Sequence, residues 1–543
     1  MSAAGIQSAV AADSVRSATV DLLRRREMTT IFGNPGSTEL GLLRDFPPDF
    51  RYVLGLHEGV AVGIADGYAQ ASARPAFVNL HSATGVGNAM GAVVNAFHNR
   101  APLVITAGNQ DRRHLELEPY LFARSTALMA PYVKHSHQPA RAQDVPAAID
   151  RAWALARTPP CGPTFVSVPS DDWDAPLAAS PPAAGEILTA ASPDAAVLDE
   201  LAERIEASAS PGLIVGDGVD RDAAWEAVIT LAERLNAPVW TAPQSPRLGF
   251  PEDHRHYQGH LAPGRASAAA QLAGLDLALV LGAPVFAFLP YQPGGPRLPP
   301  LIHVTDDAEE AARAPAALRV VAGVRPVAEG LNERVAPRGG TAAAPPSRPR
   351  PPAPPAASPI APAFLMAALA HALPQDAVVV EESPSNRNEL REHVWIRRPA
   401  SFFATASGGL GFAMPAAVGI KLAWPSRPVV CLIGDGSALY APQSLWSAVQ
   451  VGAAVAFVVV DNGRYAILES VAQFAGVSGL PSMALPGLDL VALAQSLGCR
   501  AIRVTDPQDL GPALAEAIAA QEPMLVDVVV DPAPVPLLRS EPV

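Results

Sequence analysis

The feature that most constrains the fold is a pair of polar motifs, each of which follows an apolar run. The apolar runs at 429–433 and 455–460 have the length and composition of buried parallel strands. Gly-Asp-Gly-Ser follows the first run at 434–437, and Asp-Asn-Gly follows the second at 461–463. Residues 441–451, between them, have the pattern of a helix. We therefore expect a strand–helix–strand unit within a parallel sheet.

The two motifs have the chemistry of a cation site. Neighbouring parallel strands end at the same edge of a sheet, so Asp435 and Asn462 should lie together. One carboxylate with amide and carbonyl oxygens suits Mg²⁺, which prefers oxygen ligands and often binds phosphate as well. Gly436 would allow the backbone to approach a diphosphate closely. Two ordinary turns are the alternative, but the combined pattern resembles the metal–diphosphate motif of thiamine diphosphate (ThDP) enzymes.

The composition indicates a globular protein that does not bind nucleic acid. Of the 543 residues, 49% are hydrophobic, and the net charge is −13 without any block of basic residues. The three cysteines lack metal-ligand spacing, which suggests a reducing compartment and no disulfides. No apolar run approaches the length needed to span a membrane, and the N-terminus has no basic leader. We expect a cytoplasmic protein without a membrane partner.

Composition along the chain predicts three domains, each of the α/β class. A stretch rich in Pro and Ala at 336–362 predicts an extended linker, because such a sequence cannot hold a sheet. A flexible extension at 1–13 precedes the first domain, and the domains are expected at 14–180, 193–335 and 363–543. Each alternates short apolar runs with helical patterns, which predicts a parallel sheet flanked by helices.

The expected strands follow from these apolar runs, and the first helix is expected at 15–26. The strands are predicted at 29–32, 76–80, 103–107, 212–215, 239–242, 277–281, 377–380, 429–433, 455–460 and 524–530.

Three segments of the first domain place polar residues after predicted strands. Gly-Asn-Pro-Gly-Ser-Thr occupies 33–38, Glu58 lies where an apolar run meets a helix start, and His81 ends another run. Each has an ordinary explanation: a turn with an N-cap, an acidic helix N-terminus, and a structural histidine. Ligand sites of parallel sheets lie at this carboxyl edge, however, so the three segments also predict one site.

The order of these segments resembles the ThDP-dependent 2-keto acid decarboxylases, most closely the benzoylformate decarboxylases. Gly-Gly-Leu-Gly at 408–411 and longer stretches at 45–52, 63–72 and 282–286 support the resemblance, which covers nearly the whole chain. It implies pyrimidine-binding, central Rossmann-like and diphosphate-binding domains. It also implies ThDP with Mg²⁺, or Ca²⁺ in its place, as cofactors. No flavin is expected, because the middle domain lacks Gly-x-Gly-x-x-Gly.

The resemblance assigns roles to particular residues. Glu58 would hydrogen-bond the aminopyrimidine ring of the cofactor, His81 would act as general acid and base, and Ser37 would hold the substrate carboxylate. Leu410 would bend the cofactor, and Gly408 would offer it a carbonyl. Asp435, Asn462 and the Arg464 carbonyl would bind the metal. The other expected cofactor contacts are Asn34, Pro35, Ser385, Gly434, Gly436, Ser437 and Tyr465; Pro384 stands where the family often has a hydroxyl residue.

One departure from the family pattern leaves the reaction open. Benzoylformate decarboxylases present a second active-site histidine from the middle domain, and Leu289 occupies its place here. A decarboxylase without this histidine would convert a 2-keto acid to an aldehyde and CO₂ more slowly than its relatives do. Alternatively, the chain is a carboligase or lyase of the acetolactate synthase or benzaldehyde lyase type. The middle-domain residues His254, His256 and His260 are candidate replacements, although nothing in the sequence places them at the site.

The pocket wall and the assembly are also inferred from the resemblance. Ile467, Leu468 and Val471 would line the substrate pocket, although their spacing also fits the core face of a helix. Because the cofactor of these enzymes lies between two subunits, at least a homodimer is expected, and a tetramer is usual. A scaffold protein that retains the fold without catalysis is the remaining alternative, and the presence of Glu58 and His81 argues against it.

Overall fold

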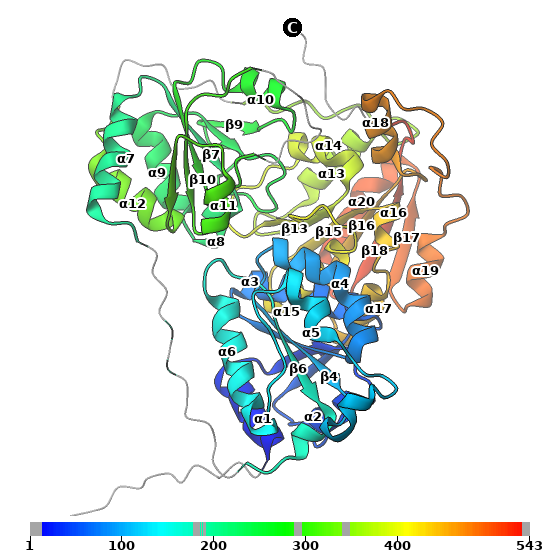
Figure 1. The fold of residues 1–543 in the computed structure, drawn as a ribbon. Coiled ribbons are helices and arrows are strands. Elements are labelled where there is room, and N and C mark those ends of the chain that lie inside the picture. Colours follow the sequence, from blue (N-terminus) through cyan, green and yellow to red (C-terminus); the bar gives the residue numbers. More distant parts are fainter. Residues whose placement is uncertain are drawn as a thin grey trace, which may run out of the picture. The chain divides into compact units, whose positions relative to one another are not determined.

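The computed structural model describes residues 14–177, 185, 187, 192–286, 296–338 and 348–534 and contains three parallel sheets flanked by helices (Figure 1). The chain divides into two compact units, which we describe separately. The first unit comprises residues 1–188 with 418–423, and the second comprises 189–417 with 424–543.

The first unit contains one six-stranded sheet in the order β2-β1-β3-β4-β6-β5, and all its pairings are parallel. Its strands are β1 Thr30–Gly33, β2 Arg51–Leu54, β3 Ala76–Leu80, β4 Leu103–Asn109, β5 Ser136–His137 and β6 Thr164–Pro169. Its main helices are α1 Val15–Arg25, α2 Leu40–Leu43, α3 Glu58–Ser72, α4 Ser82–His98, α5 Ser125–Met129 and α6 Val145–Arg157. Ser14 begins α1 through a reciprocal capping box with Ser17, whose backbone N–H it accepts.

The second unit contains two six-stranded parallel sheets. The middle sheet has the order β12-β11-β10-β7-β8-β9, and helices α7, α9 and α12 cover one of its faces (Figure 1). Its strands are β7 Pro211–Val215, β8 Val239–Thr241, β9 Tyr257–His260, β10 Leu277–Leu281, β11 Leu301–Thr305 and β12 Leu318–Val321. Its helices are α7 Ala195–Ala207, α8 Asp217–Arg221, α9 Trp225–Leu235, α10 Arg265–Gln271, α11 Ala308–Arg313 and α12 Val324–Arg334.

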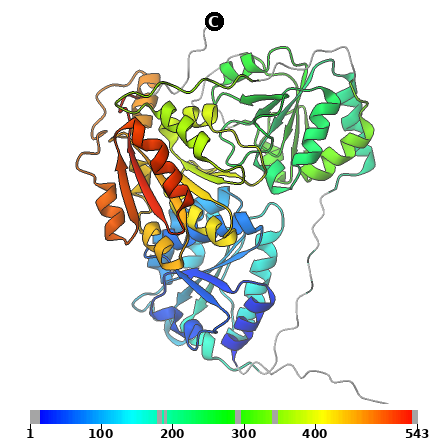
Figure 2. The ribbon, with the colours of Figure 1, turned by 180° about the vertical axis from the view of Figure 1, so that it is seen from behind.

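The last sheet has the order β14-β13-β15-β16-β18-β17, and helix α20 packs along its red strands (Figure 2). Its strands are β13 Val378–Glu382, β14 Phe402–Ala404, β15 Val429–Gly434, β16 Val455–Asp461, β17 Arg500–Val504 and β18 Met524–Val529. Its helices are α13 Pro362–Ala372, α14 Arg387–His393, α15 Ala413–Ala423, α16 Asp435–Ala438, α17 Gln443–Val451, α18 Ala466–Ala475, α19 Leu490–Ser496 and α20 Pro507–Ala519. The strands of this sheet share one apolar core with the middle domain.

Every strand expected from the sequence is present, with its ends within two residues of those predicted. The central strands β3 and β10 match the predicted bounds. The strands that were not predicted are β2, β5, β6, β9, β11, β12, β14 and β17. Several of these lie at or next to sheet edges, and the fully buried β6 and β11 are broken up by Ser, Thr, His or Pro, so neither forms an uninterrupted apolar run.

A buried polar network joins the middle domain to the last one. The Glu252 carboxylate accepts hydrogen bonds from the Tyr257 hydroxyl at 3.1 Å and from the Ile396 backbone N–H at 2.8 Å, and its Oε1 lies 3.1 Å from His260 Nε2. Burial lowers the pKa of His260 to about 4, so this ring is neutral near pH 7. The ring of His256 is buried as well, with Nδ1 at 3.0 Å from the Ala237 carbonyl. Both histidines therefore take part in the packing of these domains, and their proposed role as replacements for a second active-site histidine stays untested.

The described end of the predicted linker packs on the last domain. Arg348 and Arg350 donate to the backbone carbonyls of Arg391 and His393, each at 2.9 Å. Both guanidinium groups lie 5.3 Å from the ring centroid of Trp395. Cation–π contacts and hydrogen bonds therefore fix this part of the segment, although its composition suggested only an extended spacer. Residues 339–347 and the N-terminal extension lie outside the described part of the chain.

The three cysteines are free, and Cys431 is buried within β15. In the described part of the chain, no helix combines the length and the apolar character needed to cross a membrane.

A buried carboxyl in α3 should make stability depend on pH. Asp66 is fully buried, with Gln70 donating to Oδ1 at 2.7 Å and Asn99 donating to Oδ2 at 2.9 Å. Burial raises the pKa of Asp66 to about 7, although both amides favour the charged form.

We expect the Asp66→Asn variant to gain stability relative to the wild type as the pH rises. An unfolded aspartate titrates near pH 4, so between there and about pH 7 the unfolded chain loses a proton that the folded chain keeps. The stability contribution of Asp66 is therefore full below about pH 4 and falls by roughly 1.4 kcal/mol per pH unit up to the folded pKa. The amide that replaces the carboxyl in the variant cannot ionise, and the neighbouring amide that faces its NH₂ group can turn to present oxygen to it. Melting temperatures at pH 5 and pH 7.5 test this, and a constant difference between the two proteins would contradict it.

Candidate functional site

The first unit places three predicted residues at the carboxyl edge of its sheet. Gly33 of β1 pairs with Leu54 of β2 and with Asn79 of β3, so these three strands end together. The segments that follow them carry Ser37, Glu58 and His81 respectively. The sheet topology therefore brings the three predicted segments to one edge.

His81 contacts a buried carboxylate that the sequence did not single out. Its Nδ1 atom lies 2.8 Å from Glu39 Oε2 and 3.1 Å from the Thr38 hydroxyl. Glu39 is only 1% exposed. Its Oε2 also accepts the Gly36 N–H at 2.8 Å, and its Oε1 accepts the Thr38 hydroxyl at 2.6 Å and the Gly108 N–H at 2.9 Å. The Glu39 carboxylate acts as an acceptor toward all three of these donors, so we expect it to accept from His81 as well, which places a proton on Nδ1. Nε2 of His81 is then free to exchange protons.

The turn that contains Ser37 is fixed by the same carboxylate. A Cβ atom on Gly36 would lie 2.3 Å from His81 Nδ1, so only glycine allows this close approach of the turn to the ring. Ser37 follows as the first residue of a short 3₁₀ turn and is exposed to solvent. Asn34 is half-buried and Pro35 is exposed in the preceding loop.

Glu58 begins helix α3 and is buried. His57 caps this helix, since its Nδ1 accepts the Gly59 N–H at 3.1 Å. Asn88 of α4 donates to Glu58 Oε2 at 3.1 Å. A Cβ atom on Gly85 would lie 3.0 Å from Glu58 Oε1, so the small residue leaves room for the carboxyl. Glu58 is thus held between the start of α3 and the first two turns of α4, with one oxygen already bonded.

Backbone strain accompanies this edge of the sheet. Ser82, directly after His81, has a φ of 43°, which is unfavourable for a residue other than glycine. Its side chain is buried, and its hydroxyl has no hydrogen-bond partner among the described residues. Such strain concentrates at functional sites.

The second unit places Asp435 and Asn462 at the ends of neighbouring strands. Strand β15 pairs in parallel with β16, with Gly434 opposite Val460. Asp435 Oδ1 accepts the Gly436 N–H at 2.7 Å, whereas its buried Oδ2 has no hydrogen-bond partner among the described residues. Burial, with a smaller contribution from the neighbouring Asp461 carboxylate, raises the pKa of Asp435 to about 7. A cation would remove the cost of this buried carboxylate.

The loop after β16 is shaped for the same site. Asn462 Oδ1 accepts the Arg464 N–H at 3.1 Å, and Tyr465 donates its N–H to the Met483 carbonyl at 2.8 Å. A Cβ atom on Gly436 would lie 2.6 Å from the Tyr465 ring. An aromatic ring of this chain therefore lies close to Gly436, and the expected approach of a diphosphate there stays a prediction. In the described part of the chain, no cluster of three or more His, Cys, Asp or Glu side chains could hold a metal. The predicted set of Asp435, Asn462 and the Arg464 carbonyl contains only one side chain of these four types, so it does not form such a cluster.

The remaining predicted cofactor contacts lie near the carboxyl ends of β13 to β15. Ser385 lies in a short 3₁₀ turn after β13, and Ser437 is buried in α16. Gly408 is exposed with a φ of 74°, and Leu410 is half-buried in the loop before α15.

Two residues of the predicted pocket wall are exposed, one is half-buried, and one lies outside the described residues, so the pocket itself stays a prediction. Leu468 and Val471 are 46% and 42% exposed, so they are not the core face of α18, which Ala466 and Ser470 form instead. Ile467 is half-buried. Leu289 lies outside the described residues, so its surroundings stay a prediction.

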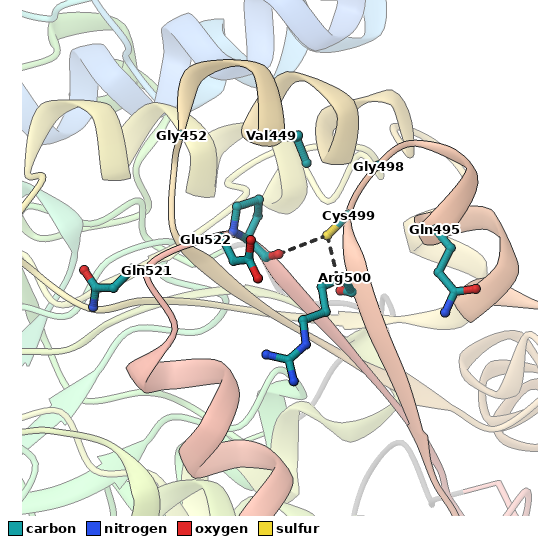
Figure 3. A pocket seen from close by; sticks show the side chains of 9 residues that line it. Val449, Gly452, Gln495, Gly498, Cys499, Arg500, Gln521 and Glu522 are labelled. Atoms are coloured by element: carbon teal, nitrogen blue, oxygen red, sulfur yellow. Dashed lines mark hydrogen bonds between the residues drawn. The ribbon is translucent and has the colours of Figure 1, made fainter.

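A cavity of about 350 Å³ lies at the opposite edge of the last sheet (Figure 3). Its lining includes Cys499 and Pro523, which precede β17 and β18 and so mark the amino edge. The Cys499 sulfur approaches the carbonyls of Arg500 and Pro523 at 3.5 Å, and burial raises its pKa to about 12. A thiol with this pKa is inert, and the cavity is separate from the predicted site.

Comparison with known families identifies all three domains. The thiamine pyrophosphate enzyme N-terminal TPP binding domain matches residues 13–139, the central domain matches 198–331, and the C-terminal TPP binding domain matches 385–528. The chain belongs to the thiamine pyrophosphate enzyme family. Membership accounts for the three parallel sheets and implies thiamine diphosphate as the cofactor of this enzyme.

Individual relatives of this thiamine pyrophosphate enzyme are similar over nearly the whole chain. It is 44% identical to benzoylformate decarboxylase of Pseudomonas aeruginosa over 521 residues, which are 95% of this chain and 98% of the relative. The crystal structure of benzoylformate decarboxylase from Polynucleobacter necessarius has a TM-score of 0.94 at 39% identity and covers 96% of this chain and 100% of its own. The ThDP-dependent 4-hydroxybenzoylformate decarboxylase of Rhodococcus jostii RHA1 has a TM-score of 0.92 at 42% identity and covers 95% and 99%.

Proposed function

We propose that the protein decarboxylates a benzoylformate-like 2-keto acid to an aldehyde and CO₂, with ThDP and Mg²⁺ as cofactors. Close homology to benzoylformate decarboxylase supports ThDP-dependent decarboxylation of a 2-keto acid. The single structural observation that supports it most is the Glu39–His81 pair beside Ser37 and Glu58 at one sheet edge. An aromatic substrate agrees with those of the benzoylformate and 4-hydroxybenzoylformate decarboxylases that are 39–44% identical to this chain.

The residues of the first unit divide the work of the reaction. ThDP, when bound, supplies the nucleophilic carbon and the electron sink that decarboxylation requires. The exposed Ser37 hydroxyl would bind the substrate carboxylate, and the buried Glu58 carboxyl would hold a proton on the aminopyrimidine ring. His81 would exchange protons through Nε2, because Glu39 occupies Nδ1. Asn34 and Pro35 would contact the cofactor from the loop after β1.

The residues of the second unit fit a metal-bound diphosphate. Asp435 has a buried oxygen without a partner among the described residues, next to a second carboxylate, and this is the setting in which a divalent cation stabilises the ionised form. Asn462 and the Arg464 carbonyl would complete the protein ligands, with Mg²⁺ or Ca²⁺ as the ion. Ser437, Ser385, Gly434 and Tyr465 would contact the diphosphate. Gly408 and Leu410 would contact the remainder of the cofactor.

Chelation should therefore release the cofactor. We expect EDTA treatment to remove ThDP from the wild type and added Mg²⁺ or Ca²⁺ to restore binding, measured as ThDP retained after gel filtration. Asp435→Asn should not recover binding, because a neutral amide lacks the negative charge that the buried carboxylate supplies to the cation. The exposed Asp509→Asn on α20 is the matched control and should behave as the wild type. ThDP that stays bound in EDTA would contradict the metal site.

We also propose at least a homodimer. Large apolar side chains are exposed on α18 and after it, namely Leu468, Val471, Phe474 and Val477 at 42–50%. Apolar surface of this kind usually marks an interface. The family arrangement, in which a cofactor lies between two subunits, would cover it. Light scattering on the purified chain tests this, and a monomer that retains activity would contradict it.

Leu289 favours a second candidate reaction, carboligation, because leucine cannot transfer a proton to release the aldehyde. Product analysis separates the two reactions. Benzoylformate with and without an excess of acceptor aldehyde should yield benzaldehyde as the main product in both mixtures. A 2-hydroxy ketone as the main product whenever an acceptor is present would favour the carboligase.

A further inference from the structure

The end of β13 carries two buried glutamates that no role assigned above uses. Glu381 and Glu382 are 0% and 1% exposed. Glu381 accepts the Ser383 N–H at 2.6 Å and pairs with Arg387 at 3.0 Å, so it fixes its own turn. Glu382 points elsewhere, toward the loop that precedes α15.

Glu382 accepts three backbone hydrogen bonds from consecutive residues. Its Oε1 accepts the Gly411 N–H at 2.7 Å, and its Oε2 accepts those of Phe412 and Ala413, each at 2.7 Å. These donors lie at the N-terminus of α15, where helix N–H groups have no partner within the helix. A carboxylate at this position satisfies them and interacts favourably with the helix dipole.

The loop that these bonds hold is the one with two proposed cofactor contacts, Gly408 and Leu410. On its other side, Ser407 Oγ accepts the Gly409 N–H at 2.9 Å and lies 3.0 Å from the Thr405 hydroxyl. Gly411 has a φ of 94°, and a Cβ atom there would lie 3.2 Å from Tyr440 Cβ. The segment is therefore fixed at both ends by this chain alone.

We propose that Glu382 is a positioning residue that holds the 408–411 loop in its cofactor-binding conformation before the cofactor arrives. This inference rests on the proposed function, because the contacts of Gly408 and Leu410 with ThDP belong to it. Burial of a carboxyl is unfavourable unless hydrogen bonds offset it, and Glu382 offsets it with donors from this one loop. A rigid loop binds a cofactor more tightly than a mobile one, since less freedom is lost on binding.

The test compares Glu382→Gln with Glu381→Gln in the full chain. A glutamine side chain has one acceptor oxygen, so at least one of the three N–H groups loses its partner in Glu382→Gln. Hydrogen exchange of a peptide spanning 409–414 in the cofactor-free protein should be faster in Glu382→Gln than in the wild type. Glu381→Gln should leave exchange there unchanged, because Glu381 bonds to Ser383 and Arg387 and not to the N–H groups of 411–413. The Kd for ThDP with Mg²⁺, measured by calorimetry, should rise at least about tenfold in Glu382→Gln.

Unchanged exchange at 409–414 in Glu382→Gln, or an unchanged Kd for ThDP, would overturn the proposal. If Glu382→Gln does not fold, Glu382→Asp replaces it, since the shorter carboxylate cannot reach all three N–H groups and should accelerate exchange in the same peptide. The exchange measurement uses no cofactor, so it remains valid if the wild type fails to bind ThDP. A wild type that does not bind ThDP would contradict the proposed function, but the exchange result would still test whether Glu382 holds the loop.

Discussion

Glu58→Gln should lower kcat for decarboxylation by about 10²–10⁴-fold, the range expected when one general acid–base group is lost. The carboxyl is buried at the start of α3, and Asn88 already bonds its Oε2, so one oxygen remains for the cofactor. An amide at this position keeps the shape of the side chain but cannot accept or release the proton that the aminopyrimidine ring requires. Initial rates of CO₂ release at saturating ThDP and Mg²⁺ give the comparison.

The matched control for Glu58→Gln is Glu27→Gln in the same unit. Glu27 lies before β1, at the amino edge of the sheet, and forms an exposed ion pair with Arg74. Surface substitutions of this kind are usually neutral, so its kcat should match that of the wild type. If Glu58→Gln binds ThDP and has the kcat of the wild type, Glu58 has no role in the mechanism.

Glu39→Gln should also lower kcat by about 10²–10⁴-fold, although Glu39 would not touch the substrate. A glutamine must place its NH₂ group toward one of the two oxygen positions. On the Oε2 side the NH₂ would face His81 Nδ1 and force the proton onto Nε2. On the Oε1 side it would oppose the donors of Thr38 and Gly108. In a Ser-His-Asp protease the corresponding change to an amide costs about 10⁴-fold, because it stabilises the wrong tautomer of histidine.

A positioning role predicts a specific pattern for this variant. The pH dependence of kcat should change in Glu39→Gln, while the Kd for ThDP should stay near the wild-type value because Glu39 contacts the histidine and not the cofactor site of the second unit. Glu39→Asp keeps the charge and should recover part of the activity. Loss of ThDP binding together with loss of kcat would show instead that Glu39 only supports the fold of the turn.

The parts of the site that the sequence predicted depend on local order along the chain. Asp435 and Asn462 each follow a strongly apolar strand, and parallel pairing of β15 with β16 places the two strand ends together. The same reasoning located His81 at the end of β3, whereas Glu58 was located by the apolar run and the helix start on either side of it. Strand ends of this kind can be predicted because the apolar run marks the strand and the first polar residue marks the edge.

The parts that were missed depend on contacts between distant segments. Glu39 lies three residues after Gly36, and this spacing would have indicated a carboxylate that turns back to the Gly36 N–H, as in a capping box. Nothing local indicated His81, which is 42 positions further along the chain, as the second partner. Glu382 was missed for the same reason, since the loop it holds lies beyond β14. Asp461 was recognised as part of the 461–463 motif. Its effect on the pKa of Asp435 was not predicted, because it depends on the pairing of β15 with β16 in the folded sheet.

CO₂ release from benzoylformate by the full chain, reconstituted with ThDP and Mg²⁺, tests the central claim most directly. We expect one CO₂ and one benzaldehyde for each benzoylformate consumed, with no release when either cofactor is omitted. A protein that binds ThDP and Mg²⁺ but releases no CO₂ from benzoylformate, 4-hydroxybenzoylformate or pyruvate would contradict the assignment as a 2-keto acid decarboxylase.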